Sequence, residues 1–137
     1  MQASAPTMVE PVDLTLPFSA ESAHVARDYL VSWLDGISAN VEERDDARLI
    51  ISELVGNAIR HARPLDGGTV MVGWAVDADG LSISVTDGGA RTTPERVDAG
   101  VSSLSGRGLS IVETLATRWW VESSRSRTTV HARIALD

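Results

Sequence analysis

The amino-acid sequence predicts an α+β fold, a two-layer sandwich in which one mixed β-sheet carries helices on one face. Apolar residues recur at helical spacing in some stretches and alternate with polar residues in others. The order is strand, helix, helix, strand, strand, irregular segment, helix, strand, strand. The 137 residues, 43% hydrophobic and 23% charged, are typical of one globular domain. We therefore expect a flexible lead-in over residues 1–11 and a single domain over 12–137.

Composition excludes several classes of protein. The chain has no cysteine, which excludes disulfides, thiolate metal sites and a cysteine nucleophile. All 12 Lys and Arg residues are arginine, and the absence of lysine excludes a P-loop ATPase and Schiff-base chemistry. The net charge of -7 argues against nucleic-acid binding. No signal sequence and no apolar run of about 18 residues are present, so we expect no membrane association and a cytoplasmic location.

The N-terminal elements are a strand and a helix. Residues 12–18 alternate apolar and polar side chains, which is typical of a strand, and Pro17 indicates an edge or a strand end. Ser19 or Ser22 can cap the helix that follows, and this helix ends at Gly36.

The central helix begins near Val41 and ends before Arg63-Pro64, because the residue before a proline disfavours helix. Its apolar residues fall within one arc of about 100°: Ala47, Ile51, Leu54, Val55, Ala58 and Ala62. Glu53, Asn57 and His61 are spaced four apart and form a polar line beside that arc. Asparagine is a poor helix former, so its place within the helix calls for a reason.

The C-terminal half contains a hairpin, a long irregular segment, a helix and two strands. The hairpin strands span 69–76 and 81–86, and the last two strands span 118–122 and 128–136. Residues 88–108 are rich in Gly, Ser, Thr and Asp. Irregular segments of this length in a small domain are usually functional.

Two short segments have the chemistry of a nucleotide site. Asp87 at a strand end can accept a hydrogen bond from an exocyclic amine, and the missing side chains of Gly88 and Gly89 allow a flat base to approach the backbone. Ser105-Gly106-Arg107-Gly108-Leu109 opens a helix, where free N–H groups attract phosphate. Each segment alone is a weak signal.

Taken together, these motifs form a much stronger pattern, in the order helix, strand end and loop-to-helix. They are Glu53-x-x-x-Asn57, Asp87-x-Gly89 and Gly106-x-Gly108-Leu109. The set resembles the conserved boxes of the GHKL, or Bergerat-fold, ATPase superfamily. Within it, the chain is most similar to single-domain bacterial anti-sigma factors with serine-kinase activity. Residues 53–61, 119–121 and 128–130 also look like that branch, so the resemblance covers residues 12–136.

The resemblance implies a role for each motif residue. Asn57 would be the metal ligand, holding Mg²⁺ against the ATP phosphates. Glu53 would be the catalytic residue, either a general base on a substrate hydroxyl or a group that orients it. Asp87 would accept the adenine amine, and Gly89 would leave room for the ring.

The remaining implied contacts involve the phosphates. Residues 88–108 would form an ATP lid, and Gly106 and Gly108 would let it fold over the phosphates. The resemblance adds further nucleotide-binding candidates, namely Arg60, His61, Arg107 and Leu109.

The implied cofactors are ATP and Mg²⁺, and the implied partners are a sigma factor and a STAS-type anti-sigma antagonist that would be phosphorylated. Members of this branch often dimerise, so a homodimer is a further expectation.

Two departures leave a second interpretation open, a nucleotide-dependent binding module without phosphoryl transfer. Arg91 stands where the family often has a glycine, and Leu104-Ser105 stand where kinase members can have an arginine. The catalytic module of a histidine kinase is a weaker third interpretation, since no dimerisation helices with a phospho-acceptor histidine precede the domain.

Overall fold

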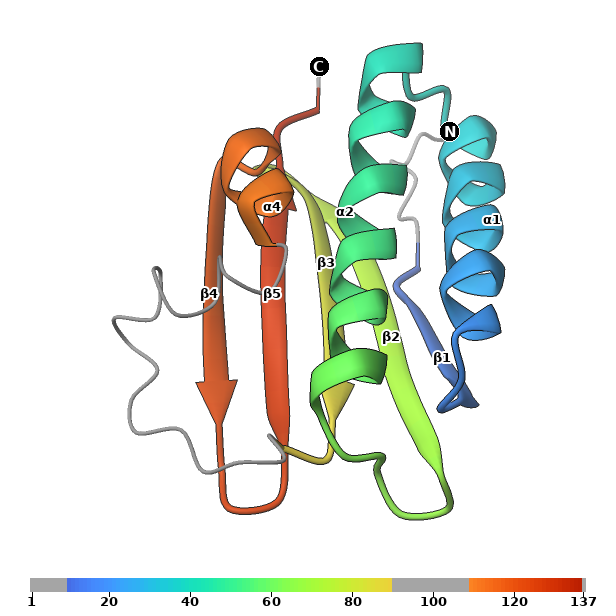
Figure 1. Cartoon of the computed structure of the whole chain (residues 1–137). Coiled ribbons are helices and arrows are strands. Elements are labelled where there is room, and N and C mark those ends of the chain that lie inside the picture. Colours follow the sequence, from blue (N-terminus) through green and yellow to red (C-terminus); the bar gives the residue numbers. More distant parts are fainter. Residues whose placement is uncertain (1–9, 90–108, 137) are drawn as a thin grey trace.

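The computed structural model describes residues 10–89 and 109–136, which fold into a sheet with helices over one face (Figure 1). The order of elements agrees with the order predicted from the sequence. In chain order they are β1 (Val12–Pro17), α1 (Glu21–Gly36), α2 (Val41–His61), β2 (Thr69–Asp77), β3 (Gly80–Asp87), α4 (Ser110–Leu115), β4 (Arg118–Ser123) and β5 (Thr128–Ile134).

The sheet has five strands in the order β1-β2-β3-β5-β4, and all four pairs of neighbours are antiparallel. The α+β sandwich is confirmed, but the prediction of a mixed sheet is wrong. The crossover through α4 brings β4 back in the same direction as β3 (Figure 1). The hairpin strand β5 then inserts between β3 and β4, so the two parallel strands are not neighbours.

Helix α2 begins and ends where local sequence signals place its ends. Asn40 is the N-cap of a capping box: its side chain accepts a hydrogen bond from the Glu43 N–H at 2.8 Å, and the Glu43 carboxylate accepts one from the Asn40 N–H at 2.9 Å. The helix ends at His61, two residues before Arg63-Pro64.

The start of α1 differs from the prediction. Its N-cap is Ala20, and no side chain caps the helix. The hydroxyl of Ser22 instead donates to the carbonyl oxygen of Pro17 at 2.6 Å, so the buried Ser22 ties the helix to the end of β1. A serine near a helix start can hydrogen-bond several neighbouring backbone groups, and spacing alone does not choose among them.

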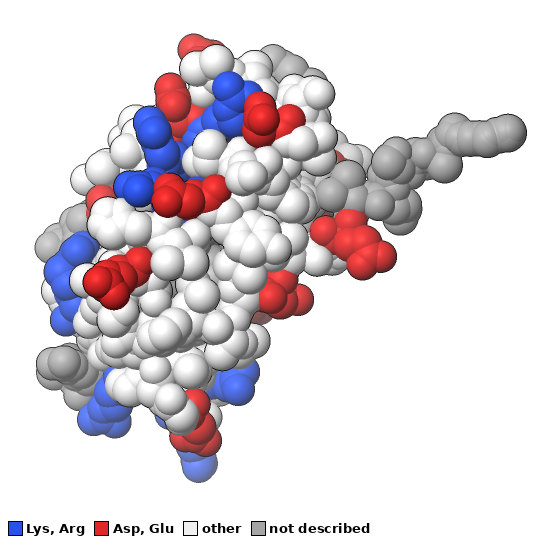
Figure 2. Space-filling view, turned by 90° about the vertical axis from the view of Figure 1, so that its right-hand side faces the viewer, with Lys and Arg blue, Asp and Glu red and all other residues white. Residues whose placement is uncertain are grey.

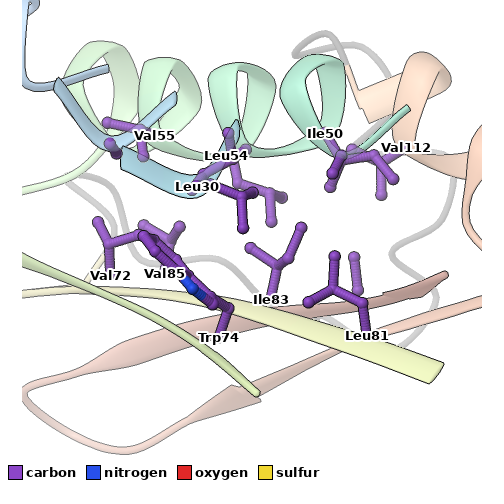
Figure 3. Packing of buried hydrophobic residues seen from close by; sticks show 14 of the residues in the cluster. Leu30, Ile50, Leu54, Val55, Val72, Trp74, Leu81, Ile83, Val85 and Val112 are labelled. Atoms are coloured by element: carbon purple, nitrogen blue, oxygen red, sulfur yellow. The ribbon is translucent and has the colours of Figure 1, made fainter. Parts of the chain in front are cut away.

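The core lies between the helices and the sheet (Figure 3). The apolar arc predicted for α2 is buried in full, together with Ile50. On β3 the burial alternates, so that Leu81, Ile83 and Val85 face the helices. Asp87 is the next residue in this alternation, and it is the one carboxylate among the buried residues of the described segments.

The outer face of the helical layer carries paired charges. Arg27, Arg44 and Arg48 form ion pairs with Asp28, Asp35 and Asp45 at 3.2, 3.5 and 3.2 Å. Figure 2, which views the molecule from the side of α1, shows acidic and basic groups intermixed in this way. Exposed pairs of this kind stabilise a fold little.

Candidate nucleotide site

Asp87 ends β3 with its side chain in the core-facing layer, where only 6% of the residue is exposed. One carboxylate oxygen accepts a hydrogen bond from the Gly89 N–H at 2.7 Å. Burial raises the pKa of Asp87 to about 6, and the Gly89 hydrogen bond offsets only part of this effect. A buried carboxylate with this environment is costly for folding, which makes it a candidate for binding a ligand.

Gly89 has the backbone conformation and the space that close approach of a base requires. Its φ of +100° is one that residues with side chains rarely adopt, and no atom of the described residues lies within 4 Å of the position that a Cβ would take. The prediction that both glycines make room for a base therefore fits Gly89 only. The space at Gly88 is filled by protein, by the carbonyl of Pro64.

The end of β3 is joined to the residues that follow α2. The Gly88 N–H donates to the Arg63 carbonyl at 2.8 Å, and the Arg63 N–H donates to the Gly89 carbonyl at 2.9 Å. These bonds fix Asp87 relative to the C-terminal half of α2. The structure thus brings together two motifs that are separated by thirty residues of sequence (Asn57 to Asp87).

The side-chain amide of Asn57 has no hydrogen-bond partner among residues 10–89 and 109–136. Its nitrogen and its oxygen are both buried. Buried amides of this kind are rare in folded proteins, because leaving a group unsatisfied costs about 1–3 kcal/mol. The amide of Asn57 could donate a hydrogen bond from its N–H to a ligand, and its oxygen could coordinate a cation.

Glu53 and Arg60 lie on the same side of α2 as Asn57. Glu53 is partly buried, and it makes no hydrogen bond or ion pair within the part of the chain that the structure describes. Arg60 is exposed and has no ion pair with a described residue. Its guanidinium lies back along the helix beside Gly56, where a Cβ would come within 3.0 Å of a guanidinium nitrogen. His61, one turn beyond Asn57, is partly buried.

The remaining predicted residues fall into two groups. Gly106, Arg107 and Gly108, and most of the predicted lid over 88–108, lie outside the described residues. Leu109 is described and is 2% exposed, with its side chain in the hydrophobic core at the start of α4. A role of Leu109 in nucleotide binding would therefore fall to its backbone.

Thr128 is a further candidate that the motifs did not single out, and its hydroxyl shares a hydrogen bond of 3.3 Å with that of Ser123. It is the cross-strand partner of Asp87, and residues directly opposite each other in an antiparallel pair point to the same face. The neighbouring pair, Thr86 and Thr129, share a hydrogen bond of 2.8 Å. The signal available in the sequence was the Thr-Thr-Val segment, but its pairing with β3 required the strand order.

The model of the histidine kinase-like ATPase domain family matches residues 16–134, so the chain belongs to that family. This confirms the resemblance to the GHKL superfamily and assigns a nucleotide-binding fold to the chain.

Two similar proteins place the chain within the superfamily. The anti-sigma F factor of Clostridium acetobutylicum is 27% identical over 127 residues, which covers 86% of this chain and 87% of that protein. A crystal structure of the RsbU and RsbW domains of a Mycobacterium tuberculosis protein superposes with a TM-score of 0.74 at 25% identity. The match covers 93% of this chain and 33% of that one, so the chain spans a third of that longer protein.

Across residues 10–89 and 109–136, no helix combines the length and apolar character needed to cross a membrane.

Proposed function

We propose that this protein binds ATP with Mg²⁺ and is an anti-sigma regulatory factor that phosphorylates a serine or threonine of a STAS-type antagonist in the cytoplasm. The observation that carries the proposal is the side-chain amide of Asn57, which is buried and has no hydrogen-bond partner among the described residues. It lies on the helix that is joined to the buried Asp87. Similarity to an anti-sigma F factor over most of both chains supports the regulatory part.

In this proposal Asp87 recognises adenine. A carboxylate accepts a hydrogen bond from the exocyclic amine, and its burial excludes the water that would compete for it. Gly89, with open space beside it, admits the edge of the ring. The hydrogen bond from the Gly89 N–H holds one carboxylate oxygen in place and leaves the other available.

Asn57 and Arg60 would serve the phosphates. The amide oxygen of Asn57 suits a hard cation, and Mg²⁺ when bound neutralises part of the charge of the phosphate oxygens. The guanidinium of Arg60, which has no ion pair among the described residues, lies one turn back along α2 beside Gly56. It would supply a positive charge to the phosphates.

Glu53 would be the general base. Side chains on a helix lean toward its N-terminus, so the carboxylate of Glu53 lies one turn before Asn57 on the same polar line. The acceptor hydroxyl oxygen forms a bond to the γ-phosphorus while the bond from that phosphorus to the bridging oxygen breaks. The proton passes to Glu53 and ADP leaves. The phosphorylation state of the antagonist would then decide whether the protein holds the sigma factor.

The alternative is a nucleotide-dependent binding module with no transfer activity, which Arg91 and Leu104 in the predicted lid favour. Glu53→Gln separates the two functions, because it removes the base but keeps the size of the side chain. We expect transfer of labelled γ-phosphate from ATP to STAS-domain proteins of the same genome to fall by about 10²–10⁴-fold, while ATP binding is retained. Full transfer by Glu53→Gln would contradict the role of Glu53, and no transfer by the wild type would favour the binding module.

A further inference from the structure

Gly88 lies between two residues of the proposed adenine site, yet the position of its Cβ faces protein and not the open space. A methyl group there would overlap the carbonyl oxygen of Pro64, and it would come within 2.9 Å of the Pro64 carbonyl carbon and 3.0 Å of the Arg63 carbonyl oxygen. These are backbone atoms, so the methyl group could be accommodated only if the two chain segments moved apart.

The close approach at Gly88 permits two backbone hydrogen bonds. Arg63 accepts from Gly88 at 2.8 Å and donates to Gly89 at 2.9 Å, so both bonds join the same short segment to the end of β3. On one side of this junction Asp87 and Gly89 form the proposed adenine site. On the other side, α2 ends at His61 and leads directly into Arg63.

Helix α2 carries the proposed phosphate and catalytic residues, Asn57 and Glu53. The junction at Gly88 is therefore a direct covalent and hydrogen-bonded path between the group that would hold the base and the groups that would hold the phosphates. A ligand that spans both sites binds well only if their separation matches its length, because the groups of a binding site must be held within about 0.5 Å of the productive geometry.

We propose that Gly88 is a positioning residue, whose missing side chain lets β3 close on the Arg63-Pro64 backbone and so sets the distance between the adenine site and the Asn57 site. This role rests on the proposed function, ATP binding. Gly88 contacts neither base nor phosphate in this account. Its effect is to hold the two sites at a separation that lets one ATP molecule occupy both.

The test compares adenosine with Mg²⁺-ATP by calorimetry on the full chain. The wild type is expected to bind Mg²⁺-ATP more tightly than adenosine. In Gly88→Ala the affinity for adenosine should stay within about threefold of the wild-type value. The ratio of the Mg²⁺-ATP affinity to the adenosine affinity, which we call the gain, should fall by about tenfold or more. General destabilisation would not separate the two ligands, because it would lower both affinities together.

Gly36→Ala is the matched control, because Gly36 ends α1 and no atom of the described part of the chain lies within 4 Å of its Cβ position. It should leave both affinities unchanged. If Gly88→Ala does not fold, Pro64→Ala, which loosens the opposing carbonyl, must reduce the same gain to a smaller extent. An unchanged gain in the variant that folds overturns the positioning role alone. Absence of ATP binding by the wild type overturns the proposed function and this role together.

Discussion

At the scale of single residues, Asp87 and Asn57 indicate a ligand site because burying their polar groups costs folding free energy in the free protein. Each is a polar side chain kept away from water: Asp87 is a carboxylate with a raised pKa, and Asn57 is an amide that finds no hydrogen-bond partner in residues 10–89 and 109–136. Neither arrangement stabilises the free protein. Both are explained if a ligand completes them.

The raised pKa of Asp87 predicts a particular pH dependence of stability. Between the ordinary pKa of 3.8 and about 6, the folded protein holds a proton that the unfolded chain has lost. The free energy of unfolding therefore falls as the pH rises through this window, by up to about 3 kcal/mol, and the loss persists above it.

Asp87→Asn should remove this decline, since the neutral amide still accepts from the Gly89 N–H. We expect the variant to match the wild type near pH 4 and to exceed it in unfolding free energy by about 1–3 kcal/mol above pH 7. Denaturant unfolding at a series of pH values measures this difference. Parallel profiles for the two proteins would show that Asp87 is not a desolvated carboxylate.

At the scale of elements, periodicity accounts for the positions of some candidate residues on α2 and β3. The polar line of Glu53, Asn57 and His61 beside the buried arc follows from a repeat of 3.6 residues, and the buried position of Asp87 follows from the alternation along β3. The joining of the two elements did not follow, because the Gly88–Arg63 bonds depend on where two distant segments meet. The serine cap at α1 failed for a similar reason, since Ser22 found a tertiary partner in Pro17.

Replacing Gly56 in α2 should change both the stability of the protein and its affinity for ATP. A glycine within a helix costs about 1 kcal/mol relative to alanine, so Gly56→Ala should raise the free energy of unfolding. The added methyl would meet the Arg60 guanidinium at 3.0 Å and displace it from the turn that holds Asn57. We expect a more stable protein whose affinity for ATP, but not for adenosine, falls several-fold.

Thermal unfolding measures the change in stability, and calorimetry measures the affinities for ATP and adenosine. Arg60→Ala is the matched comparison. It should show the same loss of ATP affinity without the gain in stability. If Arg60→Ala binds ATP as the wild type does, the guanidinium has no role at the phosphates.

At the scale of the whole molecule, the sandwich places the site where the end of β3 meets the C-terminal end of α2 (Figure 1). The α+β class and the helices on one face were predictable from element order, because a sheet with one apolar face needs a covering layer. The antiparallel arrangement of the whole sheet was not predictable, because the insertion of β5 between β3 and β4 leaves no local signal in the sequences of these strands. Three arginines of the helical layer are paired with aspartates, and acidic and basic groups are intermixed on this side (Figure 2). Arg60 beside the site has no such pair among the described residues.

The central claim is that ATP and Mg²⁺ bind at the buried amide of Asn57. Calorimetric titration with ATP, with and without Mg²⁺, tests it on the wild type and on Asn57→Leu. The leucine removes an unsatisfied buried amide, so the variant should unfold with a free energy equal to or about 1–2 kcal/mol above that of the wild type. The account predicts tight, Mg²⁺-dependent binding by the wild type and loss of the Mg²⁺ dependence in a variant that is folded and stable. Equal Mg²⁺-dependent binding by both proteins, or no binding by the wild type, would contradict it.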